Sequence, residues 1–197
     1  MQKTPHVILI LSLVLVALAT PAWAQRVLVV PTADVLSSAM EVDFVYHRGV
    51  SSVGVQFGIY PGLGAGLRQE LGGHLHATLK AAILEETENR PGFAIGGELS
   101  LDKQHVYAVV SKQLGNPSLR GHAAFGLGRF SRGMAGLTYM LNPVKLSNAP
   151  TTSLFVEYDG LGLNGGLIAQ FSPEFRANLG FASGHGLSVG INYQLVF

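Results

Sequence analysis

The sequence predicts an all-β fold: a transmembrane, antiparallel up-and-down β-barrel of about twelve strands, give or take two. The first observation is the C-terminal end, where apolar side chains occupy every second position from Leu187 to Phe197. The second is that this alternation recurs along the chain in segments of roughly seven to eleven residues, and a tilted strand needs about 9–11 to cross a bilayer. The third is composition, with 25 Gly among 197 residues and only 13% charged residues.

The first 24 residues are expected to be a cleaved secretory signal peptide. A basic start precedes an uncharged apolar run at 7–19, and small residues lead to a cleavage site between Ala24 and Gln25. The apolar run is shorter than the ~20 residues that a membrane-spanning helix needs. The chain has no Cys, so neither a disulfide nor a lipid-attachment site is expected. Residues 1–24 are therefore assigned to the signal peptide and 25–197 to a single barrel domain.

After a short extended lead-in at 27–33, the alternation defines the strands in order. In each, the apolar side chains share one face, and Gly, Ser, Asn, Gln or charged side chains share the other. The segment 106–112 is the exception, because positions 106–110 are all apolar and leave its two faces undecided. The expected strands are 40–47, 52–59, 63–68, 74–83, 93–100, 106–112, 119–127, 135–141, 153–158, 161–170, 175–181 and 187–197.

Turn-forming residues separate these strands, which favours a meander in which each strand pairs with its sequence neighbour. Two connections are longer than the rest, at 85–92 and 142–151. With twelve strands and both termini in the periplasm, both would be periplasmic, where outer-membrane barrels usually keep short turns. The turn signals are Pro61-Gly62, Gly72-Gly73, Arg90-Pro91-Gly92, Gly115-Asn116-Pro117, Asp159-Gly160, Ser172-Pro173 and Ser183-Gly184.

The polar face favours a barrel in lipid over a soluble protein. A soluble sandwich needs a solvated face rich in Lys, Glu and Thr, whereas the polar face here is mostly Gly, Ala, Ser, Asn and Gln, which suits a narrow lumen. A secreted soluble β-sandwich that binds a ligand is the alternative. Several aromatic residues lie at strand ends, as in the interfacial girdles of membrane barrels: Tyr60, Phe130, Phe171, Phe175 and Phe197.

The last strand allows its two faces to be assigned. An arginine at position 191 is expected to reduce the amount of folded barrel, whereas an arginine at position 192 is expected to be tolerated because it points into the lumen. The set expected to face lipid is Leu187, Val189 and Ile191, and the set expected to face the lumen is Ser188, Gly190 and Asn192.

Charged side chains of both signs fall on the predicted lumen face, and the two signs nearly balance. This balance suits cross-strand ion pairs better than a selectivity ring of one sign, with a polar constriction in a narrow pore as the sharper alternative. A net charge of +1 without basic runs argues against nucleic acid as a partner. The predicted lumen charges are Arg68, Glu70, Lys80, Glu98, Arg120, Glu157 and Arg176.

No motif indicates an enzyme, a cofactor or a metal. His122, Ser153 and Glu157 are all expected to point inward, yet nothing in the sequence ties them into a catalytic group. His74 and His76 share a strand face at a spacing that suits a metal ion, but no third ligand is apparent. A membrane-embedded acyl hydrolase or acyltransferase that modifies lipid is therefore kept only as an alternative function.

Three segments carry a resemblance to a known family: 30–36 reads VPTADVL, 107–115 reads YAVVSKQLG, and 156–160 reads VEYDG, followed by LNGGL at 163–167. In these segments the chain resembles the barrel portions of YjbH-type outer-membrane proteins, which are associated with exopolysaccharide production. The resemblance implies an outer-membrane barrel with a link to polysaccharide. Members of that family are several times longer and are regarded as lipoproteins, whereas this chain has no Cys. The resemblance therefore supports the barrel fold and an outer-membrane location more than it supports a role in polysaccharide export.

The expected function is that of a small passive pore or a structural component of the bacterial outer membrane. The resemblance implies a link to exopolysaccharide production or export. The expected partners are outer-membrane lipid, the barrel-assembly machinery that would recognise Phe197 at the C-terminus, and polysaccharide.

Overall fold

The computed structural model describes residues 26–142 and 149–197, and this part of the chain folds into twelve antiparallel strands that close into one barrel. The predicted all-β, antiparallel up-and-down barrel and its strand number are confirmed. The strands are β1 (Ala39–His47), β2 (Val50–Tyr60), β3 (Leu63–Glu70), β4 (Leu75–Leu84), β5 (Gly92–Leu99), β6 (Gln104–Gln113), β7 (Leu119–Leu127), β8 (Met134–Met140), β9 (Thr151–Tyr158), β10 (Leu163–Gln170), β11 (Phe175–Ala182) and β12 (Gly186–Val196).

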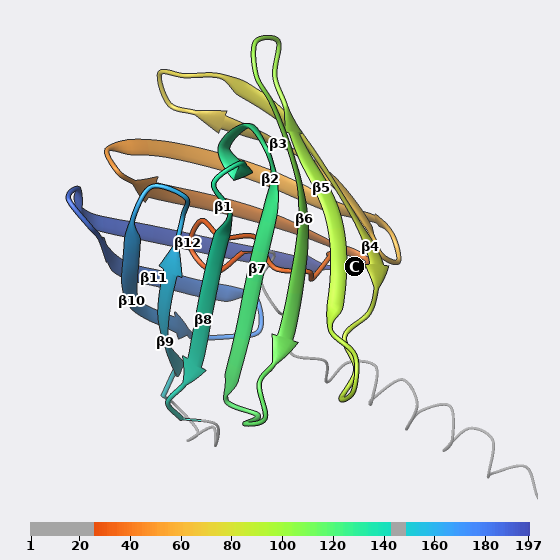
Figure 1. The fold of residues 1–197 in the computed structure, drawn as a ribbon, viewed down its shortest axis with the longest axis vertical. Coiled ribbons are helices and arrows are strands. Elements are labelled where there is room, and N and C mark those ends of the chain that lie inside the picture. Colours follow the sequence, from red (N-terminus) through yellow and green to blue (C-terminus); the bar gives the residue numbers. More distant parts are fainter. Residues whose placement is uncertain (1–25, 143–148) are drawn as a thin grey trace, which may run out of the picture.

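Every strand pairs with its sequence neighbours, and β1 pairs with β12 to close the barrel. The closing register places Phe44 opposite Ile191 and Glu41 opposite Gln194. Figure 1 shows β5 to β8 standing upright at the front, while β12, β1 and β2 run across behind them. The helical turn η1 (Gly128–Phe130) lies between β7 and β8. Among the residues that the structure describes, no helix is long and apolar enough to cross a membrane.

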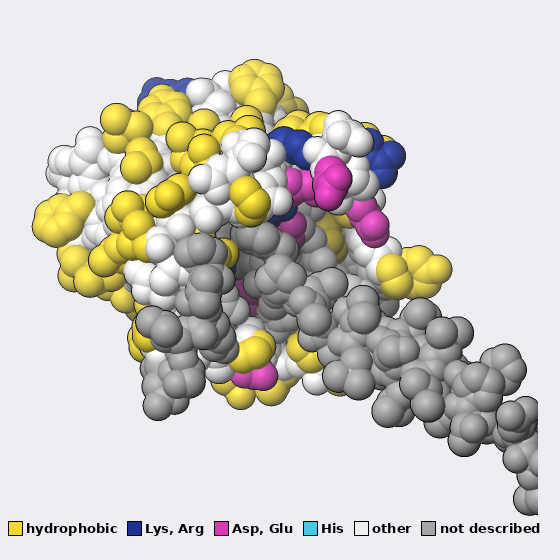
Figure 2. All heavy atoms as spheres, turned by 90° about the horizontal axis from the view of Figure 1, so that it is seen from below, with side chains coloured by type: hydrophobic (Ala, Val, Ile, Leu, Met, Phe, Trp, Pro, Cys, Tyr) yellow, Lys and Arg dark blue, Asp and Glu magenta, His cyan; other side chains and the backbone are white. Residues whose placement is uncertain are grey.

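The alternation places apolar side chains outside and polar ones inside. On β12, Leu187 is 47% exposed on the outer face, whereas its neighbour Ser188 is fully buried on the inner face. The strand whose faces were undecided from sequence, β6, turns Tyr107, Val109 and Ser111 inward. Seen from the end that carries the longer connections, much of the surface is hydrophobic, and acidic and basic side chains gather in one area of the rim (Figure 2).

The barrel has two different ends. The strand order brings the start of β1 and the end of β12 to one end, here called the terminal end, together with the connections 85–91 and 141–150. The opposite end, here called the turn end, carries shorter connections such as the two-residue turn at Arg48 and Gly49, both with positive φ. The two longest connections thus lie beside the termini, as the strand count predicts.

Residues 26–38, here called the lumen segment, lie inside the barrel. They form no strand, apart from one isolated bridge between Arg26 and Pro31, and most of their side chains are buried. In Figure 1 this segment appears as the red-to-orange loop between the front and back walls. The sequence predicts only a short extended lead-in here, so the occupied lumen is a feature that sequence reasoning missed.

Candidate functional site: the occupied lumen

One carboxylate from the barrel wall holds the first turn of the lumen segment. The backbone N–H groups of Leu28, Val29 and Val30 all donate to Oε2 of Glu157, at 3.2–3.3 Å. The turn itself is closed by the Val27 N–H, which donates to the Val30 carbonyl oxygen at 2.9 Å. Glu157 lies on β9 and is 1% exposed. A buried carboxylate needs such donors, because an unpaired buried charge is costly.

Other strands supply side chains that bind the backbone of the same segment. Arg176 and Asn178 on β11 donate to the carbonyl oxygens of Arg26 and Val27, and Lys80 on β4 donates to that of Asp34. Ser111 on β6 accepts the N–H of Ala33 at 2.7 Å. Side chains from four strands therefore bind the backbone of the lumen segment. These hydrogen bonds fix the position of the segment inside the barrel.

Apolar packing adds to these hydrogen bonds. Val27 and Leu28 pack with Val45, Phe155 and Ile168 from the wall, and Val30 and Ala33 belong to a second buried cluster, which also contains Val109 and Phe130. Phe130 is fully buried, so its assignment to an interfacial girdle is wrong: it packs on Tyr107 inside the barrel, with ring centroids 4.5 Å apart.

Glycines on the inner face make room for the segment. A Cβ at Gly58 would lie 2.6 Å from the Leu36 carbonyl oxygen, and one at Gly190 would lie 3.2 Å from Cδ1 of Leu28. Glycines at these inward-facing positions therefore leave room for the lumen segment, and glycine also allows the sheet to curve.

Asp34 links the lumen segment to the terminal end through ion pairs. Its carboxylate accepts two hydrogen bonds from Arg120, at 2.7 and 2.8 Å, and Arg120 also donates to Glu86 in the connection after β4. Burial alone would raise the pKa of Asp34, but the hydrogen bonds and charge of Arg120 hold that pKa below its ordinary value. The carboxylate is therefore charged in the folded barrel at neutral pH.

Replacing Asp34 with Asn is expected to lower the free energy of unfolding at pH 7 by roughly 2 kcal/mol, because Arg120 loses a charged hydrogen-bond partner. The folded pKa of Asp34 lies below its unfolded value, so this contribution is complete above about pH 4 and is lost as the pH falls through the folded pKa. Urea unfolding in detergent at pH 7 and pH 3 measures the free energy of unfolding of wild type and variant. The difference between the two values should be smaller at pH 3 than at pH 7. The exposed Glu88→Gln is the control, and a difference that persists unchanged at pH 3 would contradict the assignment.

The seven charges predicted for the lumen all come from inward-facing positions of the wall. Six are buried or partly buried with polar partners inside the barrel, whereas Glu70 lies at the turn end, 3.9 Å from His76. They do not pair with one another. Arg68 pairs with Asp43 at 2.9 Å across β2, and Glu98 pairs with Arg129 at 2.7 Å. Sequence reasoning missed Arg129, and also Asp34 as the partner of Arg120, because both lie outside the strands. It also left out Asp43, although Asp43 lies on the inner face of β1 and is buried.

Asn192 shows that the inner face is less permissive than the sequence suggests. Its side chain is 6% exposed, accepts a hydrogen bond from Arg176 and lies 3.5 Å from the Glu41 carboxylate. An arginine at this position would stand beside Arg176 in a filled space. Asn192→Arg is therefore not expected to be tolerated, contrary to the expectation from sequence, because the lumen around this position is packed.

At the turn end, Asp159 is the centre of a second buried network. Its carboxylate accepts hydrogen bonds from Arg48 and Asn164, and Oδ2 lies 2.8 Å from Nε2 of His47. Nδ1 of His47 lies 3.0 Å from Oγ of Ser188. Burial alone would raise the pKa of Asp159, but its hydrogen bonds with Arg48, Asn164 and His47 lower it. The result is a charged hub that joins β1, β10 and β12.

The three residues considered for catalysis are not brought together. His122 contacts Ser111, not Ser153, with Nδ1 2.8 Å from Oγ, and Glu157 is engaged by the lumen segment. The series Ser188–His47–Asp159 has the connectivity of a hydrolase triad, but Ser188 is fully buried and Arg48 already pairs with the carboxylate. The contacts of this network join β1, β10 and β12 at the turn end.

The two histidines considered for a metal lie at the turn end. The rings of His74 and His76 have centroids 6.3 Å apart, and His105 lies 6.0 Å from His76. Within residues 26–142 and 149–197, no group of three His, Asp or Glu side chains is arranged to hold a metal ion.

Of the remaining assignments, Ala24 and Gln25 lie outside the described residues. Phe197 is 75% exposed, and its N–H donates to the Ser38 carbonyl oxygen at 3.0 Å, beside the start of β1. No known protein family and no curated protein matches the sequence.

Proposed function

We propose that the protein is an outer-membrane barrel of the bacterial envelope whose lumen is closed by its own N-terminal segment. With its lumen filled in this way, the protein would serve as a structural component of the envelope and not as a passive open pore. The observation that carries this proposal is the lumen segment, held by Glu157, Arg176, Asn178, Ser111 and Lys80 from four strands of the wall.

The outer face supports residence in a membrane. Large apolar side chains stand exposed around the barrel, for example Leu67 (54%), Phe125 (67%) and Leu179 (55%). A soluble protein rarely leaves so much contiguous apolar surface in water. The inner face is polar and charged, which is the distribution of a barrel that has lipid outside.

A non-catalytic role is supported by the burial of both serine–histidine contacts, since Ser111 and Ser188 are fully buried. Lipid and the barrel-assembly machinery are the partners that such a barrel would require, the latter through Phe197. The link to exopolysaccharide rests on the resemblance to YjbH-type proteins and stays a prediction.

Cell fractionation followed by a gel of unheated and boiled samples tests membrane residence. The protein is expected in the outer-membrane fraction, and its unheated form is expected to migrate differently from the boiled form, because folded barrels resist detergent. A protein that is recovered from the soluble periplasm without a heat-dependent shift would overturn the proposal.

A further inference from the structure

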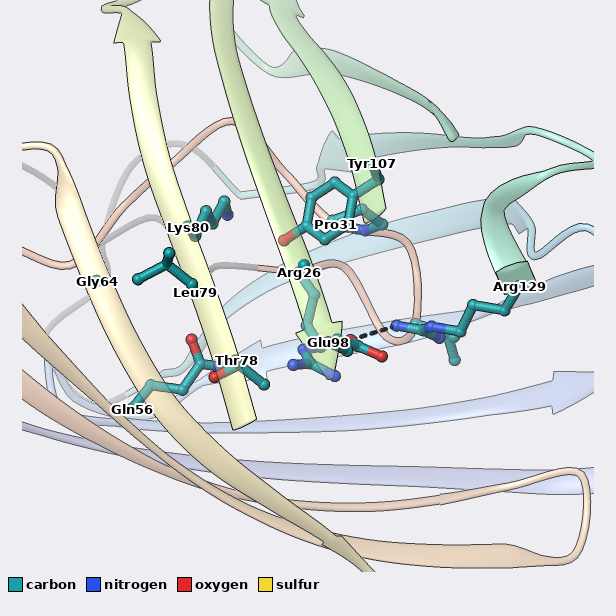
Figure 3. Close-up of a pocket in the computed structure, with 12 residues that line it drawn as sticks. Arg26, Pro31, Gln56, Gly64, Thr78, Leu79, Lys80, Glu98, Tyr107 and Arg129 are labelled. Carbon is teal, nitrogen blue, oxygen red and sulfur yellow. Dashed lines mark hydrogen bonds and ion pairs between the residues drawn. The ribbon is translucent and has the colours of Figure 1, made fainter. Parts of the chain in front are cut away.

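A small, partly open cavity lies between the lumen segment and the barrel wall, with a volume of about 20 Å³. Arg26, Val29 and Pro31 of the lumen segment form one side, and the other side comes from β2 to β6 and from Arg129 in η1. Figure 3 shows Arg26, Glu98 and Arg129 grouped here, with Thr78 and Gln56 alongside. A cavity of this size holds about one particle as large as a water molecule.

Hydrogen-bond donors without partners line this cavity. Nε of Arg129 and Oγ1 of Thr78 are buried and have no hydrogen-bond partner among the described residues. Buried donors such as Nε of Arg129 cost free energy unless an acceptor reaches them. Arg26 is partly buried, and no hydrogen bond or ion pair joins its guanidinium to another residue of 26–142 or 149–197, while its carbonyl oxygen accepts a hydrogen bond from Arg176.

The charges around the cavity favour an anion as that acceptor. Two arginines line it, Arg26 and Arg129, and the one carboxylate that lines it, Glu98, is already paired with Arg129 at 2.7 Å. Burial alone would lower the pKa of Arg26, but the carboxylates of Asp43, Glu98 and Glu41 outweigh burial and raise it. The guanidinium is thus a permanent cation inside the barrel.

We propose that this cavity is a binding site for one small monovalent anion of the size of chloride, held between Arg26 of the lumen segment and Thr78 and Arg129 of the wall. The Nε–H of Arg129 can only donate and the Thr78 hydroxyl is able to donate, so one small anion between them would satisfy both. This inference rests on the closed lumen of the proposed function.

The site has a consequence for closure of the lumen. An anion shared by Arg26 and Arg129 would join the lumen segment to the connection between β7 and β8. Because a ligand that binds only the folded state stabilises it by mass action, chloride should stabilise the closed barrel.

The test uses the full mature chain in detergent, in sodium chloride and in sodium gluconate at equal ionic strength. The temperature at which the folded band disappears on an unheated gel is expected to be higher in chloride for wild type. Arg26→Gln is expected to abolish this difference. Arg132→Gln, an exposed arginine of the same β7–β8 connection, is the matched control and is expected to keep the difference. Equal midpoints in the two salts for wild type, or the same chloride effect in Arg26→Gln as in Arg132→Gln, would overturn the anion site.

Crystals grown in sodium bromide provide the direct readout. An anomalous scattering peak between the Arg26 guanidinium and the Arg129 side chain is expected. If the lumen segment is in place and the cavity holds only water, the anion site is wrong while the closed lumen stands. If the lumen segment is found outside the barrel, the closed lumen itself is wrong, and the anion site falls with it.

Discussion

Removing residues 26–37, so that Gln25 joins Ser38, is expected to convert a barrel without measurable conductance into one that conducts ions in a planar lipid bilayer. Deletion leaves the polar inner face without the backbone that Glu157, Arg176 and Lys80 now bind, so water can fill the space. The wild-type barrel should give no channel steps under the same conditions. Steps of equal size in wild type and in the deletion would show that the lumen segment does not close the barrel.

A cysteine-accessibility measurement keeps this prediction testable if the deletion variant does not fold. The chain contains no Cys, so a single introduced thiol reports on one position. Val30→Cys, at a fully buried site, should react slowly with a membrane-impermeant maleimide, whereas Val50→Cys, at a site that is 49% exposed, should react at once. Adding Glu157→Leu removes the acceptor of three N–H groups and should speed labelling at position 30. Equally fast labelling at positions 30 and 50 in a folded barrel would place the segment outside.

Replacing Ile191 with Arg is expected to cost about 2–4 kcal/mol of folding free energy, because this side chain lies on the outer face at the middle of β12, where a bilayer would be most apolar. Leu187 lies on the same face of the same strand but near the turn end, where an Arg should cost only about 0–1 kcal/mol. Urea titrations in lipid vesicles, followed by the unheated gel shift, measure both. Equal losses at the two positions would mean that the outer face of β12 does not contact lipid.

Most of the twelve strands could be predicted because alternation is local and neighbouring strands of a meander pair with each other. The pairing of β1 with β12 joins the two ends of the chain and followed only from the assumption that the barrel closes. The ends of strands depend on turn contacts that alternation does not encode, as β10 illustrates. The pattern starts the strand at position 161, but the N–H groups of Leu161 and Gly162 donate to Oδ1 of Asp159 and hold these residues in the turn. The strand therefore begins at Leu163.

The occupied lumen could not be predicted in the same way, because its contacts join distant parts of the chain. Leu28 and Glu157 are 129 residues apart, and no local pattern pairs them. A signal was nevertheless present in the run of four apolar residues at 27–30, which a strand with one polar face does not explain. Inward-facing Val109 and Phe155 were a second signal, because a water-filled lumen does not need them.

The position of the lumen segment directly before β1 constrains the order of assembly. The partners of Arg26, Val27 and Leu28 lie on β9 and β11, so these contacts cannot form until most of the chain has been synthesised. β1 in turn pairs with β12, the last strand, and until that seam forms both strands present unpaired edges. The lumen segment therefore lies next to the β1–β12 pair in the sequence. A barrel that closed without this segment inside would bury the Glu157 carboxylate without the N–H groups of Leu28, Val29 and Val30. Final closure of the ring and capture of the N-terminal segment are therefore coupled, which favours a seam that shuts only around the correctly placed chain.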